Sequence, residues 1–478
     1  MPGSRWLSLL VLCAGFLLIV VDMTVVNVAL PSIRRDLSFS QAGLAWVVNA
    51  YLIAYAGLLL LAGRLGDLIG RKRMFLIGLA MFTVASLLCG LSFSQPLLIT
   101  ARFVQGIGGA ASSAVILGMV VTLFPEPAER ARAMGIFAFV ASGGGAIGLL
   151  LGGLITQTIS WHWIFFVNLP IGLATAVFAA RLLEDDPGLG LGEGADVLGA
   201  ILVTAALMLG VYTIVDSSNY GLGSTRTLAF GGVALGLLAA FIVRQAVARN
   251  PLLPLRVFGS RNVTGANVVQ ALMVAAFFGM FFMGSLYMER VLHYGPLAIG
   301  LAFLPNTLAM AALSYSFSAR LITRFGSRKI LLAGLILIAA ALSLFVRLPV
   351  QSDYLRDLLL PMALLGVGAG LSFPALTILA MADATPADSG LLSGLLNTTT
   401  QIGGSLGLAI LATLSLSRTG QLSGEGLTTA AALSGGYHLA WAIGVGLVVA
   451  AIVLAATVLR SETSVLEEPW LDEEAASA

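Results

Sequence analysis

The sequence is poor in charged residues. Asp, Glu, Lys and Arg make up 10% of the 478 residues, whereas a soluble domain typically carries about 25%. So few charges cannot give a soluble fold of this length the polar surface that it needs. Hydrophobic residues instead make up 58% of the chain, and the mean hydropathy is +0.99. The composition therefore excludes an ordinary soluble fold and indicates a chain that lies largely within a membrane.

Cysteine and histidine are also scarce. The two cysteines, Cys13 and Cys89, lie inside apolar runs and form no CxxC pair. The three histidines, His162, His293 and His438, have no spacing typical of a metal site, so we expect no metal. No G-x-x-x-x-G-K-[ST] loop occurs, so the chain lacks this means of holding a nucleotide. The net charge of +2 gives no reason to expect nucleic acid as a partner.

Long apolar runs recur along nearly the whole chain. A run of roughly 18 or more apolar residues is long enough to cross a membrane. Lipid cannot satisfy free backbone groups, and the runs are too long for barrel strands, so we expect helices. The first run continues through Asp22 without a cleavage site, which indicates a retained span and not a signal peptide. We predict fourteen spans, near residues 7–30, 44–62, 74–93, 97–122, 132–157, 163–181, 196–216, 227–246, 264–288, 297–318, 330–349, 357–381, 393–414 and 437–458.

Basic residues predict the orientation of these spans. With the N-terminus inside, the cytoplasmic segments hold 17 of the 25 Lys and Arg residues and the outer segments hold seven. The remaining residue, Arg102, lies within a span. Because cytoplasmic loops of membrane proteins carry an excess of Lys and Arg, we expect both termini in the cytoplasm and the spans in the cell inner membrane.

Two of the cytoplasmic turns are similar to each other. Residues 63–73 and 318–329 both form a basic, glycine-containing turn between a second and a third helix, if spans 1–6 and 9–14 are two related halves. Such duplicated halves are typical of transporters, whose substrate site lies between them. We therefore predict an N-terminal six-helix bundle (1–185), two inserted helices with a linker (186–260), a C-terminal six-helix bundle (261–460) and a disordered acidic cytoplasmic tail (461–478).

Four segments resemble the motifs of one transporter family. Residues 63–73, which read GRLGDLIGRKR, resemble the G-x-L-x-D-x-x-G-R-[KR] signature loop of the major facilitator superfamily. Residues 22–31 (DMTVVNVALP), 98–109 (LITARFVQGIGG) and 161–172 (WHWIFFVNLPIG) resemble helix motifs of its fourteen-span drug:proton antiporter branch. The resemblance covers about the whole chain. It implies an all-α major facilitator fold, with two six-helix bundles and two inserted helices.

The resemblance also implies a function. It predicts a proton-coupled exporter of small, largely apolar or cationic compounds, as in multidrug or antibiotic efflux, that works by alternating access. The proton gradient would supply the energy without a cofactor, and the partners would be a small-molecule substrate, protons and the lipid bilayer, with the chain a monomer. An exporter of one endogenous metabolite or self-made antibiotic is an alternative that the sequence does not separate. An intramembrane enzyme is a third hypothesis, but no paired acid and base or metal cluster supports it.

The fifth-helix motif of the branch departs from its pattern. The family pattern is G-x-x-x-G-P-x-x-G-G, and the chain has Leu149 where the proline is expected. Small residues allow two helices to approach closely, so we expect the remaining glycines to serve helix packing, while a kink at Leu149 is left open. These glycines are Gly144, Gly148, Gly152 and Gly153.

Asp22 is the strongest candidate for a functional residue. A carboxylate inside a membrane helix costs on the order of 2.5–3.5 kcal/mol on insertion scales, so it needs water, a partner or a proton. We interpret Asp22 as the residue that binds a proton and a cationic substrate in turn, in a water-accessible pocket between the two bundles. The alternative is a carboxylate near the outer helix end, paired with Arg34 or Arg35.

Arg102 is the second charged residue within the spans that we single out. A guanidinium stays charged, so it must face a cavity or a hydrogen-bonding partner. We interpret Arg102 as the residue that organises the proton site of Asp22. The alternative is a structural hub that binds backbone carbonyls.

The cytoplasmic turn at 63–73 is a candidate conformational switch. The resemblance implies that Asp67 binds a neighbouring helix end in one state of the transport cycle and releases it in another. The alternative is that the basic residues only enforce the orientation of the spans. The residues that match the switch motif are Gly63, Asp67, Gly70, Arg71 and Lys72.

Polar side chains in other spans are candidates for a substrate cavity. For each amide the alternative is a hydrogen bond between helices. For Glu289 the alternative is a surface ion pair with Arg290 or a contact with lipid headgroups, and Asp216 is interpreted as structural. The substrate-binding candidates are Asp22, Asn27, Asn49, Gln105, Asn267, Gln270, Glu289, Asn397 and Gln401.

Overall fold

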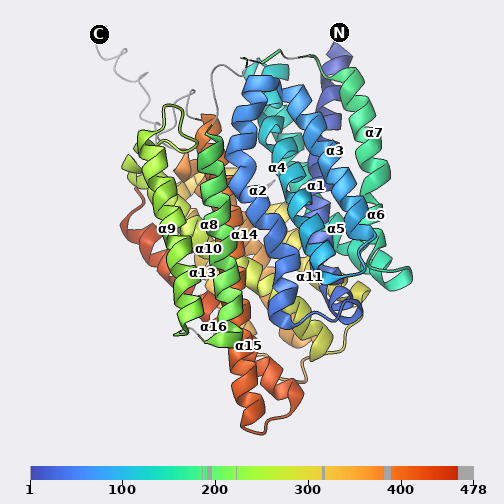
Figure 1. The fold of residues 1–478 in the computed structure, drawn as a ribbon, viewed down its shortest axis with the longest axis vertical. Coiled ribbons are helices and arrows are strands. Elements are labelled where there is room, and N and C mark those ends of the chain that lie inside the picture. Colours follow the sequence, from blue (N-terminus) through green and yellow to red (C-terminus); the bar gives the residue numbers. More distant parts are fainter. Residues whose placement is uncertain are drawn as a thin grey trace, which may run out of the picture.

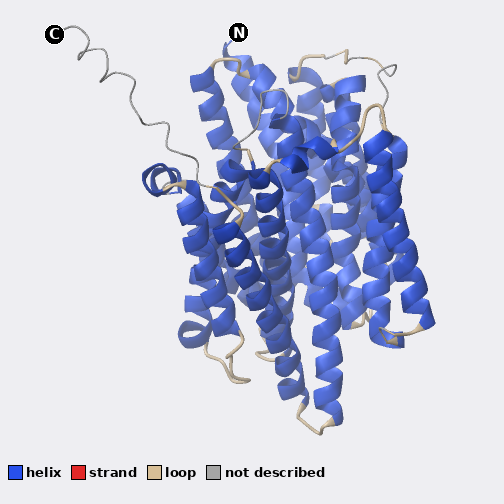
Figure 2. Cartoon of the chain, turned by 90° about the vertical axis from the view of Figure 1, so that its left-hand side faces the viewer, coloured by secondary structure: helices blue, strands red, loops and turns tan. Residues whose placement is uncertain are grey.

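A computed structural model describes residues 2–185, 187–188, 190, 196–221, 223–314, 318–381 and 389–460. Within these ranges the regular elements are helices, and no strand occurs among them. The helices run along the long axis of the molecule (Figure 1), and short loops join them at both ends (Figure 2). The acidic tail predicted at 461–478 lies outside the described residues.

The first part of the chain forms seven helices. The span expected at 163–181 is interrupted at Val167, because Pro170 has no N–H to donate to the carbonyl of Phe166. The predicted span is nevertheless confirmed, because Trp163–Leu182 together are long and apolar enough to cross a membrane. The helices are α1 (Pro2–Asp36), α2 (Gln41–Ile69), α3 (Arg71–Gly90), α4 (Gln95–Leu123), α5 (Pro127–Thr158), α6 (Trp163–Phe166) and α7 (Asn168–Leu182).

Two helices, α8 (Val197–Tyr220) and α9 (Thr225–Val247), form a hairpin that precedes the C-terminal helices. The side chain of Asp196 caps α8 by accepting from the amide of Gly199 at 3.0 Å. Arg244 Nε and Gln245 Nε2 of α9 also donate to this carboxylate, at 2.9 and 2.7 Å. Burial alone would raise the pKa of Asp196, but these three hydrogen bonds outweigh burial and lower it.

The remaining helices follow a short connecting segment. It contains η2 (Leu255–Gly259), and a second short turn of helix, η4 (Tyr354–Leu358), precedes α14. The longer elements are α10 (Arg261–Arg290), α11 (Pro296–Ala312), α12 (Ser318–Phe325), α13 (Ser327–Phe345), α14 (Leu359–Ala380), α15 (Ser389–Gly424) and α16 (Thr429–Thr457).

Twelve helices of the described chain are long and apolar enough to cross a membrane. Two further helices, α5 and α11, contain apolar stretches of fewer than 18 described residues, Ile147–Thr158 and Pro296–Ala312, although α5 as a whole has 32 residues. The sequence predicted spans at both places, near 132–157 and 297–318. The described helices thus match twelve of the fourteen predicted spans by length and composition.

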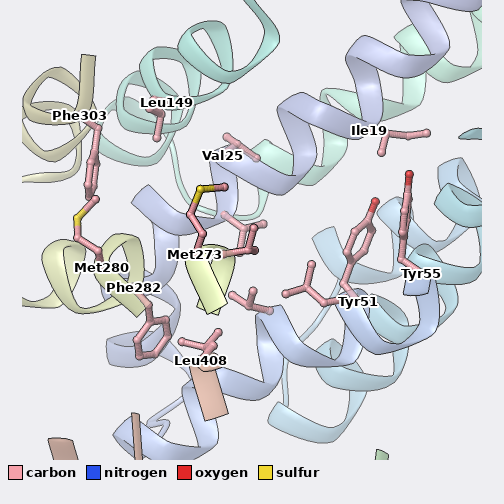
Figure 3. Packing of buried hydrophobic residues seen from close by; sticks show 14 of the residues in the cluster. Ile19, Val25, Tyr51, Tyr55, Leu149, Met273, Met280, Phe282, Phe303 and Leu408 are labelled. Atoms are coloured by element: carbon pink, nitrogen blue, oxygen red, sulfur yellow. The ribbon is translucent and has the colours of Figure 1, made fainter. Parts of the chain in front are cut away.

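One continuous core joins the N-terminal and C-terminal helices. Figure 3 shows a part of it in which Val25 of α1 and Leu149 of α5 lie near Met280 of α10 and Phe303 of α11. All four side chains are buried. Apolar burial therefore holds the two groups of helices against each other.

The hairpin of α8 and α9 lies at the seam between α2 and α15. A second buried cluster contains Ile53 of α2, Ala409 of α15 and Val211 of α8. Gly57 of α2 leaves room for Thr204 of α8, because a Cβ at this glycine would clash with the threonine side chain. One helix of the hairpin therefore contacts helices of both groups.

Candidate functional site

The side chain of Asp22 lies deep inside the N-terminal helices, with an exposed fraction of 0%. Its Oδ2 accepts a hydrogen bond from Arg102 Nη1 of α4 at 2.5 Å. Its Oδ1 accepts from Gln105 Nε2 of α4 at 2.8 Å and from Asn168 Nδ2 of α7 at 2.9 Å. Both carboxylate oxygens are therefore occupied, and one side chain links α1, α4 and α7.

Arg102 is as enclosed as its partner, with an exposed fraction of 2%. Besides Asp22, it donates from Nε to the carbonyl of Val47 at 3.1 Å and from Nη1 to Gln105 Oε1 at 2.6 Å. The guanidinium carbon lies 4.4 Å from the centre of the Tyr51 ring, within the range of a cation–π contact. The backbone contact predicted as the alternative role of Arg102 is present together with the contact to Asp22.

Two polar residues complete the network, and sequence reasoning did not identify either. Ser86 Oγ of α3 accepts from Gln105 Nε2 at 2.8 Å and from Asn168 Nδ2 at 3.3 Å. Asn168 lies in the 161–172 motif, directly after the interruption at Val167, and this position was the available signal. Ser86 carried no signal, because it is one serine in an apolar helix.

The hydrogen-bond network identifies the charged partner of Asp22. The alternative interpretation, an ion pair with Arg34 or Arg35, is wrong, because Arg102 is the charged partner. Ion and counter-ion compensate each other's burial, which is costly for either alone. All three hydrogen-bond donors to Asp22 come from α4 and α7, and the carboxylate is fully buried, so the prediction that it lies in a water-accessible pocket between the two bundles is wrong for this structure.

The turn between α2 and α3 holds the residues of the predicted switch. Asp67 Oδ1 accepts from Arg71 Nε at 3.2 Å and from Arg71 Nη2 at 3.1 Å. Arg71 Nη1 also donates to the carbonyl of Gly118 at 3.2 Å and to Thr122 Oγ1 at 3.1 Å, both on α4. Gly70 ends α2 and precedes α3 with φ 99°, a conformation that favours glycine. Asp67 therefore contacts α4 through Arg71.

The other two switch residues make different contacts. Lys72 Nζ lies 2.9 Å from a carboxylate oxygen of Asp185, and this hydrogen bond and the lysine charge lower the pKa of Asp185. A Cβ at Gly63 would make an ordinary van der Waals contact with Ala114 Cβ at 4.0 Å. In the related turn between α12 and α13, Gly326 has φ 85°, similar to the backbone of Gly70.

The glycines of α5 lie at close helix contacts. A Cβ at Gly144 would lie 2.9 Å from Leu17 Cδ1, and Cβ atoms at Gly148 and Gly152 would overlap Thr24 and Val25 of α1. At Gly153 a Cβ would lie 2.8 Å from Leu297 Cα of α11. Three glycines thus face α1 and the fourth faces α11. The helix α5 continues without interruption through Leu149.

Several candidate amides form hydrogen bonds within one group of helices. Asn27 Nδ2 donates to the Met23 carbonyl at 3.2 Å. Asn267 accepts from Thr399 at 2.8 Å, and Gln270 donates to Thr400 at 2.9 Å. The remaining candidates differ: Asn397 is exposed, whereas Asn49 and Gln401 are buried with polar atoms that have no hydrogen-bond partner.

Glu289 lies where the C-terminal ends of α1 and α10 meet. Its Oε1 is 3.6 Å from Arg35 Nε, so its partner is on α1 and the predicted pair with Arg290 is wrong. Arg290 Nη1 instead donates to Gln41 of α2 at 3.4 Å. Asp216, which we interpreted as structural, forms an ion pair with Arg226 at 3.0 Å. Within the described ranges, no three His, Cys, Asp or Glu residues form a group that could hold a metal.

A buried charge pair inside a membrane protein marks a candidate functional site. Comparison with known proteins then identifies the family. The family model described as Major Facilitator Superfamily matches residues 12–408. The chain belongs to this superfamily.

Three curated relatives cover most of the chain. The puromycin resistance protein pur8 of Streptomyces alboniger is 36% identical over 97% of this chain and 93% of its own length. The cephamycin export protein CmcT of Amycolatopsis lactamdurans is 38% identical, covering 86% of this chain and 85% of that protein. The tetracenomycin C resistance and export protein of Streptomyces glaucescens is 34% identical over 88% and 78%.

Solved structures share the superfamily fold. An auto-inhibited POT family peptide transporter has a TM-score of 0.69 and 17% identity, covering 97% of this chain and 98% of that chain. A bacterial homologue of the human lysosomal transporter Spinster, in an inward-facing and unoccupied conformation, has a TM-score of 0.67 and 17% identity, with coverage of 96% and 98%. At these identities the likeness concerns the fold alone.

Proposed function

We propose that this chain is a proton-driven exporter of small antibiotic-like compounds that works by alternating access. Membership of the superfamily and relatives that are resistance or export proteins support export. The observation that carries proton coupling is the fully buried pair of Asp22 and Arg102. An acid buried in a membrane protein is expensive to keep unless it has a role in binding a partner or a proton.

Protonation of Asp22 would remove one charge from the core and release Arg102. The guanidinium would keep its hydrogen bonds to the Val47 carbonyl and Gln105 and its position over the Tyr51 ring. Arg102 would therefore stay in place after it loses its contact with Asp22. The proton then competes with Arg102 for the carboxylate, and substrate acts on this equilibrium through the helices. The electrical part of the gradient supplies about 2.3 kcal/mol per proton for each 100 mV.

The arrangement of the chain follows from the same proposal. Two six-helix bundles, residues 1–185 and 261–460, would tilt about a substrate site between them, with 186–260 as an inserted pair. We propose fourteen spans, with α5 and α11 completing the count, and a monomer in the inner membrane with both termini in the cytoplasm. The paired turns at Gly70 and Gly326 support two related halves. The turn at Asp67 would act as the cytoplasmic switch through Arg71.

Transport into proteoliposomes under an imposed pH gradient tests this function. Asp22→Asn should abolish gradient-driven accumulation while expression is retained, because the residue can no longer bind and release a proton. Asp216→Asn is the matched control, since it removes an acid that pairs with Arg226 at the end of α8. Accumulation that survives in Asp22→Asn, or that an uncoupler leaves unchanged, contradicts proton antiport.

The range of substrates is a separate question. The relatives named above carry the name of one compound each, which favours an exporter of one antibiotic as a second candidate function. A panel of unrelated fluorescent compounds in the same vesicles separates the two. Transport of a single member would support the narrow exporter.

A further inference from the structure

Four buried polar side chains, which we call the strip, lie on α2 and α15, two helices that pack against each other. Asn49 of α2 has an exposed fraction of 0%, and Thr398, Gln401 and Ser405 of α15 have 9%, 7% and 2%. Each has a buried polar atom without a hydrogen-bond partner: both side-chain atoms of Asn49, Thr398 Oγ1, Gln401 Oε1 and Ser405 Oγ. Buried polar groups are normally hydrogen-bonded, so this group needs an explanation.

The four side chains lie along the contact between the two helices. A Cβ at Gly394 would lie 2.8 Å from Leu60, which places these residues at one level. Ile53 and Ala409 share a second buried cluster. Residue numbers therefore increase along α15 in the direction in which they decrease along α2, and the two helices are antiparallel. Asn49 and Ser405 are each eleven residues beyond the contact of Leu60 with Gly394, and therefore lie at a similar level.

The spacing within each helix supports the same face. On α15, Thr398, Gln401, Ser405 and Ala409 recur at three or four residues, the period of one helix face. On α2, Asn49 is four residues before Ile53, on the face that contacts α8 and α15. Because Arg102 binds the carbonyl of Val47, the strip also lies near the level of the Asp22 network.

The surroundings of the strip contain few charges. The sequence has no Asp, Glu, Lys or Arg at 262–288, 296–314, 359–380 or 389–417, which cover most of α10, α11, α14 and α15. In the N-terminal helices, Asp22 and Arg102 form an ion pair with each other. A bound cation would therefore find no free carboxylate near the strip, and leaving water without a counter-charge is costly for an ion.

We propose that the strip recognises the substrate and selects uncharged compounds that carry hydrogen-bonding groups on an apolar body, in preference to cations. The inference rests on the proposed export function. When α2 and α15 separate, two amide groups and two hydroxyls become free to bind donors and acceptors of the substrate. Asn267 and Gln270 do not take this role, because Thr399 and Thr400 occupy them between α10 and α15.

A matched pair of probes tests the class of substrate. Doxorubicin carries a protonated amine at neutral pH, and N-acetyldoxorubicin has the same body without the charge. Binding to the purified full-length protein is measured by fluorescence polarisation, and transport is measured in proteoliposomes with a pH gradient. The wild-type protein should bind and transport N-acetyldoxorubicin better than doxorubicin.

A matched pair of variants tests the site. Ser405→Ala should weaken binding of N-acetyldoxorubicin about three- to tenfold, the effect of one hydrogen bond. Ser415→Ala is the control, because Ser415 is also buried and unpartnered on α15 but faces Gly436 of α16. The control should bind both probes as the wild type does. Equal effects of the two substitutions would overturn the site.

A charge placed in the strip tests selection directly. Asn49→Asp and Gln401→Glu should shift the ratio of the two affinities toward doxorubicin about tenfold, because each supplies the missing counter-charge. An unchanged ratio in both variants, a wild-type preference for doxorubicin, or binding of neither probe refutes the inference. Loss of gradient dependence with the binding ratios as expected would instead refute the proposed function and leave the strip intact.

Discussion

The two members of the Asp22–Arg102 pair should respond differently to pH when each is left alone. In Arg102→Gln, the carboxylate keeps its bonds from Gln105 and Asn168 but loses its cation. Breaking a buried ion pair typically costs about 3–5 kcal/mol. A carboxylate can relieve this cost by taking up a proton. In Asp22→Asn the isolated group is a guanidinium, which does not lose its proton, so no such relief is available.

The sign of the pH effect follows from where the proton binds more tightly. In Arg102→Gln we expect Asp22 to take up a proton in the folded protein because its cation is missing, and stability should then fall as the pH rises. The slope is at most about 1.4 kcal/mol per pH unit above about pH 4, where an aspartate in the unfolded chain titrates. Two pH units then change the stability by up to about 2.7 kcal/mol. This is most of the free energy that is lost when a buried ion pair is broken. For Asp22→Asn we expect a loss of stability that does not change with pH.

The two cysteines provide the assay. Cys13 and Cys89 are both free and buried, and Cys89 Sγ lies 3.6 Å from Gln105 Oε1, beside the network. In a Cys13→Ala background, a fluorogenic maleimide reports the exposure of Cys89 on heating in detergent. Melting curves between about pH 5.5 and 7.5 should bring Arg102→Gln closer to the wild type at the acid end only. Parallel curves for both variants, or recovery of Asp22→Asn at low pH, would show that the carboxylate does not take up the proton.

Three further predictions concern other parts of the fold. Because the pKa of Asp196 is lowered, its contribution to stability is present above about pH 4 and lost as the pH falls further, so melting curves of Asp196→Asn and the wild type should converge in acid. Gly148→Ala should destabilise the protein by about 1–3 kcal/mol through overpacking, and Thr24→Ala should restore part of this in thermal melts, whereas equal melts for single and double variants would contradict the contact. Glu289→Gln removes the link of α10 to Arg35 and should increase the separation of spin labels at the C-terminal ends of α1 and α10; unchanged distances would show that the pair does not hold these ends together.

The sequence predicted the elements whose cause is local. Apolar runs predicted the long helices, and the cost of charge in lipid identified Asp22 and Arg102 separately. The sequence also suggested that Arg102 organises the proton site of Asp22, but it did not show that the two side chains bind directly across 80 positions. Asn168 is 146 positions from Asp22, and a motif without a structure does not show which side chain its amide reaches.

Other outcomes depend on how each helix is rotated about its axis. Gln270 and Gln401 are both amides in apolar helices, but Gln270 faces a hydroxyl of its neighbouring helix and Gln401 lies in the strip. Glu289 has an adjacent arginine in sequence and yet pairs with Arg35, because Arg35 lies across the contact of α1 with α10. The rotation of each helix about its axis, and the helices that it contacts, are determined by packing of the whole core. They could not be predicted from this one sequence.

The position of α8 has a mechanical consequence. It packs against Ile53 and Gly57 on one side, and on the other Thr413 of α15 donates a hydrogen bond to the Ile214 carbonyl at 3.3 Å. If α2 and α15 move apart, α8 cannot follow both and must slide along one of them. The transport cycle would therefore have to break either the close contact of Gly57 with Thr204 or the hydrogen bond from Thr413.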